Sequence, residues 1–165
     1  MNALLLGVMV AALLVSLVAG FLWAFASVVM PGIARLTDRG FVRAFQEMDG
    51  VIQRGQPLFL LIWVGSALVL LGVTVSGLVL LEGLPQIWLI GATGVYLLGV
   101  QLPTAIINIP LNNTLQACVV DDLDDEQVHR ARVVFEARWN RWNRRRTLAA
   151  CLATVLLLLT LHGMP

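Results

Sequence analysis

The segment FEARWNRWNRRRT, residues 135–147, places carboxylate, amide, guanidinium and indole side chains directly before an apolar stretch. Residues three or four positions apart share one face of a helix. One such face carries Glu136, Asn140, Asn143 and Thr147, at spacings of 4, 3 and 4. The neighbouring face carries Phe135, Trp139, Trp142 and Arg146. Convergent polar groups beside an aromatic wall are typical of a site for a small molecule.

A second polar stripe lies between residues 101 and 112. It consists of Gln101, Thr104, Asn108 and Asn112, at spacings of 3, 4 and 4. Unpaired amides are costly away from water, and Pro103 and Pro110 also free backbone carbonyls in this segment. Such groups persist inside a membrane only where protein or a water-lined cavity satisfies them. We therefore expect this stripe to face residues 136–147 inside the molecule.

Both stripes also have a purely structural explanation. Asn and Gln between membrane helices often hydrogen-bond across a helix interface, at about 0.6 kcal/mol per contact. Trp and Arg near a membrane boundary are commonly anchors in the headgroup region. Two polar stripes at the same depth beside an aromatic face exceed what a single bridge requires, and this favours a site.

Composition places the chain among membrane proteins. Hydrophobic residues make up 59% of the 165 residues and charged residues 13%, against roughly 45–50% and about 25% in soluble domains. The net charge of +1 gives no basis for nucleic-acid binding. Cys118 and Cys151 form no CxxC motif and the two histidines, His129 and His162, lie far apart, so we expect no metal site. The cores of the apolar stretches contain no ionisable residue, which disfavours ion-coupled transport.

Four stretches are long enough to cross a hydrocarbon core, which requires about 20 apolar residues. They cover about residues 3–30, 57–81, 87–109 and 147–161. Apolar residues at helical spacing after the first stretch predict an amphipathic helix over about 38–54, at the membrane interface. Its apolar face comprises Phe41, Phe45, Met48 and Ile52.

The last span is predicted to continue a longer helix. No Gly or Pro interrupts residues 126–162, so a helical extension over about 124–146 precedes the span and projects from the bilayer. We expect a single membrane domain over residues 1–165. Its fold class is all-α, an integral membrane four-helix bundle with an interfacial amphipathic helix and a long, projecting fourth helix.

Three segments resemble the membrane family named for anthrone oxygenase. They are VMPGIARLTDRGFVRAFQEMDGVI, NIPLNN and FEARWNRWNRRRT, in this order between four spans. The resemblance covers nearly the whole chain, and the last motif is the most distinctive. The matching positions are Pro31, Asn108, Pro110, Asn112, Glu136, Trp139, Asn143 and Arg146. Most bacterial members of the family are known only as a domain of unknown function.

The resemblance implies oxidation of anthrones, three-ring phenolic ketones, to anthraquinones with O2 and without an added cofactor. Such a reaction needs a base, donors or cations for the enolate, and a dry aromatic slot. With this implied chemistry, Glu136 is the candidate base and Arg146 the candidate catalytic cation. Candidate substrate-binding residues are Gln101, Asn108, Asn112, Trp139, Asn140, Trp142 and Asn143. The structural alternative is that Glu136 pairs with Arg132 or Arg43.

Two functions therefore compete. One is an oxygenase acting on a polycyclic phenol, an anthrone-like compound or a quinone precursor in a pocket on the cytoplasmic side. The other is a non-catalytic membrane protein that binds a lipid, a quinone-like ligand or a partner protein. Under both, the expected partners are the lipid bilayer and a hydrophobic aromatic molecule, and a homo-oligomer is compatible with the composition. The resemblance favours the first function, whereas the lack of a recognisable catalytic constellation favours the second.

The distribution of arginine predicts the orientation in the membrane. Residues 31–56 contain four arginines and residues 110–146 contain the other seven, and four spans place both connections on one side. Basic residues in short loops stay in the cytoplasm. We therefore expect insertion in the cytoplasmic (inner) membrane, with both connections cytoplasmic and both termini extracytoplasmic. A reporter fused after Pro165 that is active only outside the cytoplasm is the expected result, and one active only in the cytoplasm would contradict this orientation.

Overall fold

The computed structural model describes residues 3–164. Met1, Asn2 and Pro165, the ends of the domain predicted over 1–165, lie outside the described residues. Within residues 3–164 the chain forms helices and no strand. The α-helices are α1 (Ala3–Ala24), α2 (Met30–Ile33), α3 (Asp38–Gln53), α4 (Pro57–Leu80), α5 (Gly83–Tyr96), α6 (Ile109–Gln116) and α7 (Asp125–Gly163). Three π-helical segments, η1 (Phe25–Val29), η2 (Leu97–Gln101) and η3 (Thr104–Asn108), and the 3₁₀ turn η4 (Val120–Asp122) complete the chain.

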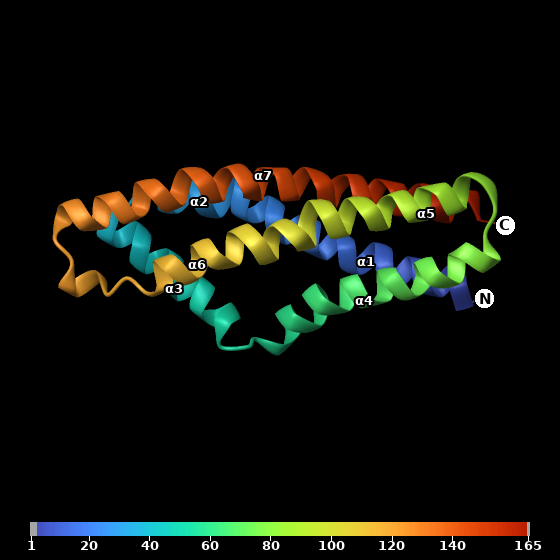
Figure 1. Ribbon diagram of the computed structural model, residues 1–165, viewed down its shortest axis with the longest axis horizontal. Coiled ribbons are helices and arrows are strands. Elements are labelled where there is room, and N and C mark those ends of the chain that lie inside the picture. Colours follow the sequence, from blue (N-terminus) through green and yellow to red (C-terminus); the bar gives the residue numbers. More distant parts are fainter. Residues whose placement is uncertain (1–2, 165) are drawn as a thin grey trace.

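The long helices form a bundle in which α7 packs against most of the other helices. Helix α7 packs against α1 and α5, and α4 packs against the same two helices on the other side. Figure 1 shows α7 along the whole length of the molecule, with the two chain ends and the α4–α5 connection together at one end. Helices α3 and α6 lie at the opposite end. The fold is therefore an all-α bundle, as the sequence predicted.

Four helical stretches of the bundle are long and apolar enough to cross a membrane. They are Ala3–Ile33, Pro57–Leu80, Gly83–Gln116 and Asp125–Gly163. Each contains one of the apolar stretches predicted from the sequence, apart from single residues at the ends, and three extend well beyond it. Helix α7 is one long helix over Asp125–Gly163, as predicted, and α3 and α6 pack along its N-terminal half. The apolar residues of α3 meet α7 there, in a cluster that includes Phe41, Phe45 and Phe135.

Proline determines where these helices widen. The segments η1, η2 and η3 end at Val29, Gln101 and Asn108, each two residues before a proline. Proline lacks a backbone N–H and its ring collides with the carbonyl four residues earlier, so an ordinary α-helical turn is disfavoured there. A π-helical turn lets the helix continue without a sharp break.

Small residues permit close contact between the helices. A Cβ atom on Gly99 would lie 2.6 Å from the Cβ of Ala149, so η2 and α7 approach closely only because residue 99 has no side chain. This is a common way for membrane helices to pack. Gly83 begins α5 after the short connection of Leu81 and Glu82, and its φ of 67° is a backbone conformation that glycine adopts at little cost.

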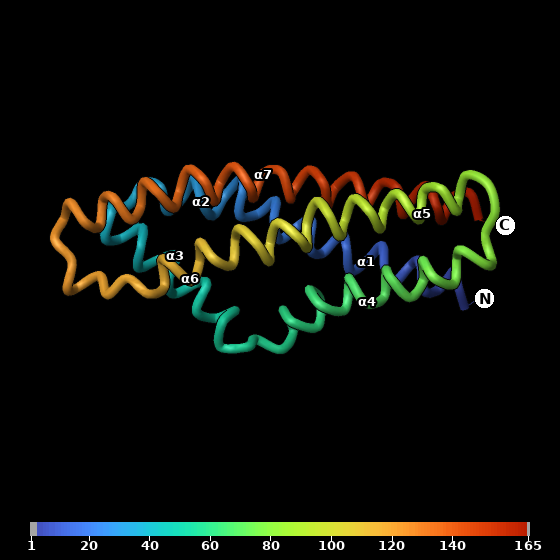
Figure 2. Tube along the Cα trace, viewed as in Figure 1, coloured from blue at the N-terminus to red at the C-terminus, as the bar shows by residue number. Residues whose placement is uncertain are grey.

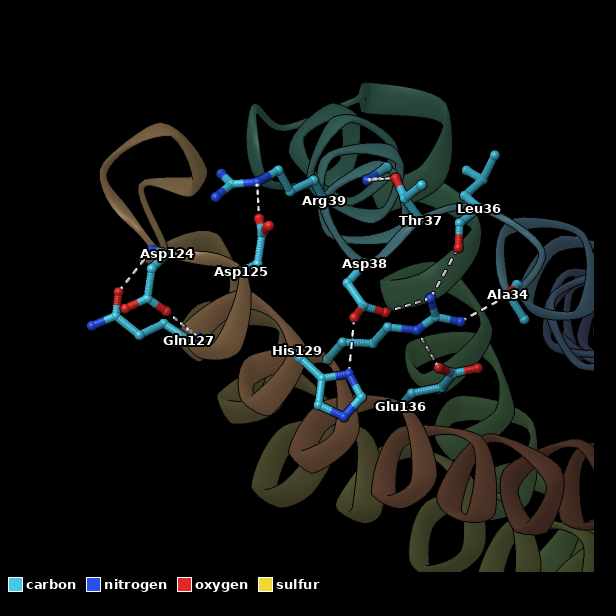
Figure 3. Close-up of polar contacts among 12 residues, drawn as sticks. Ala34, Leu36, Thr37, Asp38, Arg39, Asp124, Asp125, Gln127, His129 and Glu136 are labelled. Atoms are coloured by element: carbon cyan, nitrogen blue, oxygen red, sulfur yellow. Dashed lines mark hydrogen bonds and ion pairs between the residues drawn. The ribbon is translucent and has the colours of Figure 1, made fainter.

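Arg132 of α7 holds the connection between α2 and α3. Its guanidinium donates to the backbone oxygens of Ala34 (2.8 Å) and Leu36 (3.0 Å) and to the carboxylate of Asp38 (2.9 Å) (Figure 3). Its Nε donates to Glu136 at 2.9 Å. The first two contacts satisfy backbone oxygens at the end of α2 and in the connection after it. Arg132 therefore joins α7 to the chain between the first span and α3.

Asp38 is the acidic centre of this junction. Its carboxylate also accepts a hydrogen bond from Nδ1 of His129 at 2.8 Å. The hydrogen bond from His129, partly opposed by desolvation and assisted by Arg132, holds the pKa of Asp38 below its usual value. Because folding lowers this pKa, the contact stabilises the fold above the usual carboxyl range, and this stabilisation is lost as the pH falls through the lowered pKa.

Replacing Arg132 with lysine is expected to lower the free energy of unfolding by about 1–3 kcal/mol, because one ammonium cannot serve four acceptors in a forked geometry. Unfolding of the purified protein in mixed detergent micelles measures this loss. The matched control is Arg130→Lys, since the pair that Arg130 forms with Glu126 is exposed, and such pairs contribute little. Equal loss in the two variants would contradict the role given to Arg132.

Candidate functional site

A cavity of about 270 Å³ lies between α1, α3, α4, α7 and the η3–α6 segment. Its aromatic walls are formed by Phe21, Phe25, Phe45, Phe59, Trp63 and Trp139. Its polar lining includes Asp49, Thr104, Asn108, Asn112, Asn143 and Arg146. Mostly apolar walls with a few convergent polar groups are the usual features of a small-molecule site.

Arg146 is the cation of this cavity. Its side chain comes from α7, and the residue is 4% exposed. Its Nη1 donates to Oγ1 of Thr104 at 2.9 Å and its Nη2 donates to Oδ1 of Asn143 at 3.0 Å. No carboxylate within the described residues pairs with it, and its Nε has no hydrogen-bond partner there. A buried guanidinium with an unused N–H can bind an acceptor oxygen of a ligand.

The groups around Arg146 are themselves fixed. Asn143 donates to the backbone oxygen of Leu22 at 3.1 Å, so its carbonyl oxygen remains directed to the guanidinium. Thr104 donates to the backbone oxygen of Val100 at 2.6 Å, which leaves its oxygen as an acceptor. The guanidinium carbon also lies 5.8 Å from the ring centroid of Trp139, within the range of a cation–π contact. Arg146 is therefore held in one position.

Asn108 is the second unsatisfied group of the cavity. It ends η3, it is 2% exposed, and neither its amide nitrogen nor its amide oxygen has a partner within the described residues. Leaving a buried amide without hydrogen bonds costs about 1–3 kcal/mol. A ligand with a polar oxygen beside Asn108 and Arg146 would recover part of that cost.

Asp49 is the anion of the cavity. It lies on α3, is buried, and contacts amides instead of a cation. Its Oδ1 accepts from Nδ2 of Asn112 at 2.7 Å, and its Oδ2 accepts from Gln53 at 2.7 Å and Gln116 at 3.1 Å. A carboxylate oxygen has about two acceptor sites, so Oδ1 retains one. Asp49 can therefore accept a hydrogen bond, or a proton, from a ligand.

Trp139 lies between the two charged groups. Its indole Nε1 donates to Oδ1 of Asn112 at 2.9 Å, and Asn112 in turn donates to Asp49. Its ring also lies near the Arg146 guanidinium and packs against the rings of Phe25 and Phe45. The cavity thus has an acidic end and a basic end, joined by one indole.

Five of the nine site residues predicted from the sequence line this cavity. They are Asn108, Asn112, Trp139, Asn143 and Arg146. Gln101 instead donates to the hydroxyl of Tyr96 at 3.1 Å. Trp142 lies beside the guanidinium of Arg145, at 4.8 Å. Asn140 and Glu136 line a separate, open pocket on the arginine-rich side of α7. The two predicted stripes therefore meet only in part.

Glu136, the predicted base, is not among the cavity residues. Its Oε2 accepts from Nε of Arg132 at 2.9 Å, in the junction described above (Figure 3). This is one of the two pairings that the sequence left as the structural alternative. The catalytic assignment of Glu136 thus has no support from its position in this structure.

Asp49 was not recognised from the sequence. It lies four residues after Phe45 and three before Ile52, so it belongs to the apolar face of α3. A carboxylate on the apolar face of an amphipathic helix was the available signal. Its amide partners Asn112 and Gln116 lie on α6, and no spacing within α3 could have indicated them.

Residues 48–156 match the family described as anthrone oxygenase. This region includes both charged groups of the cavity, Asp49 and Arg146. No curated protein and no solved structure showed significant similarity to the chain. The match covers about two thirds of the sequence, contains the second and third motifs, and begins near the end of the first. The chain belongs to the anthrone oxygenase family.

Proposed function

We propose that this protein oxidises a polycyclic phenol, an anthrone-like compound or a related quinone precursor with O2, in the cavity between Asp49 and Arg146. The observation that carries the proposal is the pair of unused buried donors, Nε of Arg146 and the Asn108 amide, within aromatic walls. A planar substrate would fit between such walls, with its carbonyl oxygen at the donors. Family membership supports the reaction class.

The first chemical step is removal of a proton from the substrate. In this proposal, Asp49 takes the proton from the methylene carbon opposite the ketone of an anthrone, and the electron pair passes to the ketone oxygen as an enolate. Arg146 and Asn108 donate hydrogen bonds to the new oxyanion. These hydrogen bonds are stronger in the transition state, where the oxygen carries negative charge, than in the neutral ketone. Trp139 supplies a flat surface for the rings.

The second step consumes O2. The electron-rich carbon of the enolate bonds to one oxygen atom of O2, and the resulting peroxide takes up a proton. Loss of water then leaves a new carbonyl at that carbon. One oxygen atom is retained, the other leaves as water with the two methylene hydrogens, and the substrate is oxidised while O2 is reduced. The proposal includes no added cofactor.

The same proposal places the protein in the inner membrane. The four apolar helices fit a membrane protein, and the arginine-rich connections favour a cytoplasmic position for α3 and the first half of α7. The cavity lies towards that end of the bundle, since α3 and η3 both line it. Catalysis would then occur near the cytoplasmic leaflet.

One observation favours the competing function, binding without turnover. Three amide donors already hold the carboxylate of Asp49. A carboxylate fixed in this way suits a ligand hydroxyl that donates a hydrogen bond and keeps its proton. The protein would then retain a quinone-like molecule in the membrane without changing it.

Replacing Asp49 with asparagine should reduce the turnover of anthrone by on the order of 10²–10⁴, because a general base is lost while the shape is kept. O2 uptake by the purified protein in nanodiscs measures the rate. Glu47→Gln, an exposed carboxylate two residues away on α3, is the matched control and should leave the rate unchanged. A larger loss in Glu136→Gln than in Asp49→Asn would restore the base assigned from the sequence. No uptake by the wild-type protein, together with tight binding, would favour the binding function.

Replacing Arg146 with glutamine should weaken the binding of anthraquinone by about 10–100-fold, the loss expected for a charge-assisted hydrogen bond of 1.5–3 kcal/mol. Quenching of tryptophan fluorescence in a titration measures the affinity, because Trp63 and Trp139 line the cavity. Arg144→Gln is the matched control, since Arg144 is exposed on the same helix. Equal affinity in both variants would show that the quinone oxygen is not held by Arg146.

A further inference from the structure

The cavity has a mouth that can be located from its lining. Four of the lining residues are also exposed, namely Gln53, Leu60, Ile109 and Asn113. A side chain that borders the cavity and the exterior at once must lie at its opening. The mouth is therefore bounded by the end of α3, the first turn of α4 and the junction of η3 with α6.

One edge of this mouth is polar and closed. The Nε2 of Gln53 donates to Oδ1 of Asn113 at 3.2 Å and so joins α3 to α6 across the opening. The same nitrogen donates to Oδ2 of Asp49 inside the cavity at 2.7 Å. This edge is therefore held by hydrogen bonds that also fix the anion of the site.

The other edge is apolar and has no such bridge among the described residues. It consists of Leu60, 43% exposed, and Ile109, 47% exposed. In the tube view, the first turns of α4 lie well apart from α6 (Figure 2). Only side chains without hydrogen-bonding groups border the opening on this side, so its width depends on packing alone.

The surface around the apolar edge is also apolar. Exposed neighbours on the two helices are Leu58, Leu61, Val64, Leu102 and Ile106. All of them belong to helical stretches that are long and apolar enough to cross a membrane. Exposed apolar side chains on such helices are expected to contact lipid. The apolar edge therefore opens towards the hydrocarbon of the bilayer.

We propose that the mouth at Leu60 and Ile109 is a lateral entrance for neutral aromatic molecules dissolved in the bilayer. This inference rests on the proposed function, because it assumes that the cavity holds such a molecule. It adds a substrate class: the ligand partitions into the membrane, enters uncharged and acquires its charge only between Asp49 and Arg146. The closed polar edge excludes compounds that approach from water with a permanent charge.

Two probes test this entrance in nanodiscs, anthraquinone, which dissolves in the bilayer, and anthraquinone-2-sulfonate, which is water-soluble. Stopped-flow quenching of tryptophan fluorescence gives the association and dissociation rates. Phenylalanine at the mouth, in Leu60→Phe and Ile109→Phe, should slow both rates for anthraquinone by about tenfold and leave the affinity nearly unchanged. Matched controls are Leu61→Phe and Ile106→Phe, which add the same bulk to lipid-facing positions that do not line the cavity.

A further variant examines the polar edge. Gln53→Ala removes the bridge to Asn113, and we expect anthraquinone-2-sulfonate to associate severalfold faster in this variant. Unchanged rates for anthraquinone in both mouth variants would overturn the lateral entrance. So would association of the sulfonate with the wild-type protein as fast as that of anthraquinone. If anthraquinone does not quench the wild-type protein at equilibrium, the proposed function itself fails, and the entrance fails with it.

Discussion

Arg146 is buried without a carboxylate partner among the residues that the structure describes, and this is the constraint on which the cavity depends. A guanidinium carries five N–H donors and cannot give up its charge in the way that a buried lysine can. Burying such a group is costly unless its donors find acceptors. Within residues 3–164 the fold supplies only neutral ones, Thr104 from η3 and Asn143 from α7, together with the indole ring of Trp139 at 5.8 Å. The guanidinium therefore keeps its positive charge without a direct ion pair, which is a favourable arrangement for stabilising an oxyanion.

The widened turns of the third span bring one acceptor of Arg146, and the unpaired amide of Asn108, to the cavity. Both Thr104 and Asn108 belong to η3, which lies between Pro103 and Pro110. In a regular α-helix a proline would leave a free carbonyl and a kink. Here the π-helical turn absorbs the distortion, and π-helical turns of this kind are frequent at functional sites. The prolines therefore determine the backbone shape of the segment that carries two polar side chains of the cavity.

Much of this arrangement could be predicted from hydropathy and helical spacing, and the errors have a physical origin. The four spans and the helix 38–53 follow from uninterrupted apolar runs and from the 3.6-residue period. On α7, however, two neighbouring stripes were predicted, whereas the buried face takes Phe135, Trp139 and Arg146 from one stripe and Asn143 and Thr147 from the other. Spacing gives the angle around a helix but not which neighbour packs there. At Glu136 the element that packs against α7 is the α2–α3 connection. Glu136 forms its ion pair with Arg132 there and does not reach the cavity. Asp49 was not predicted for the same reason, because two of its three partners lie on a different helix, α6.

The two charged groups and the position of the mouth together explain how an anion could form inside the cavity without an ion crossing the apolar surface of the bundle. An ion that crossed the apolar edge at Leu60 and Ile109 would lose its hydration before reaching any partner, at a large energetic cost. A neutral molecule does not incur this cost. Folding has already removed water from Asp49 and Arg146, and the packing of the helices offsets the cost of that desolvation. In the proposed reaction, transfer of one proton inside the cavity would create the anion next to Arg146 and leave the proton on Asp49, so no net charge would enter or leave the bilayer. Trp139 lies between Asp49 and Arg146 and separates them. A direct ion pair would neutralise both side chains. Their separation is therefore what leaves each of them available to the ligand.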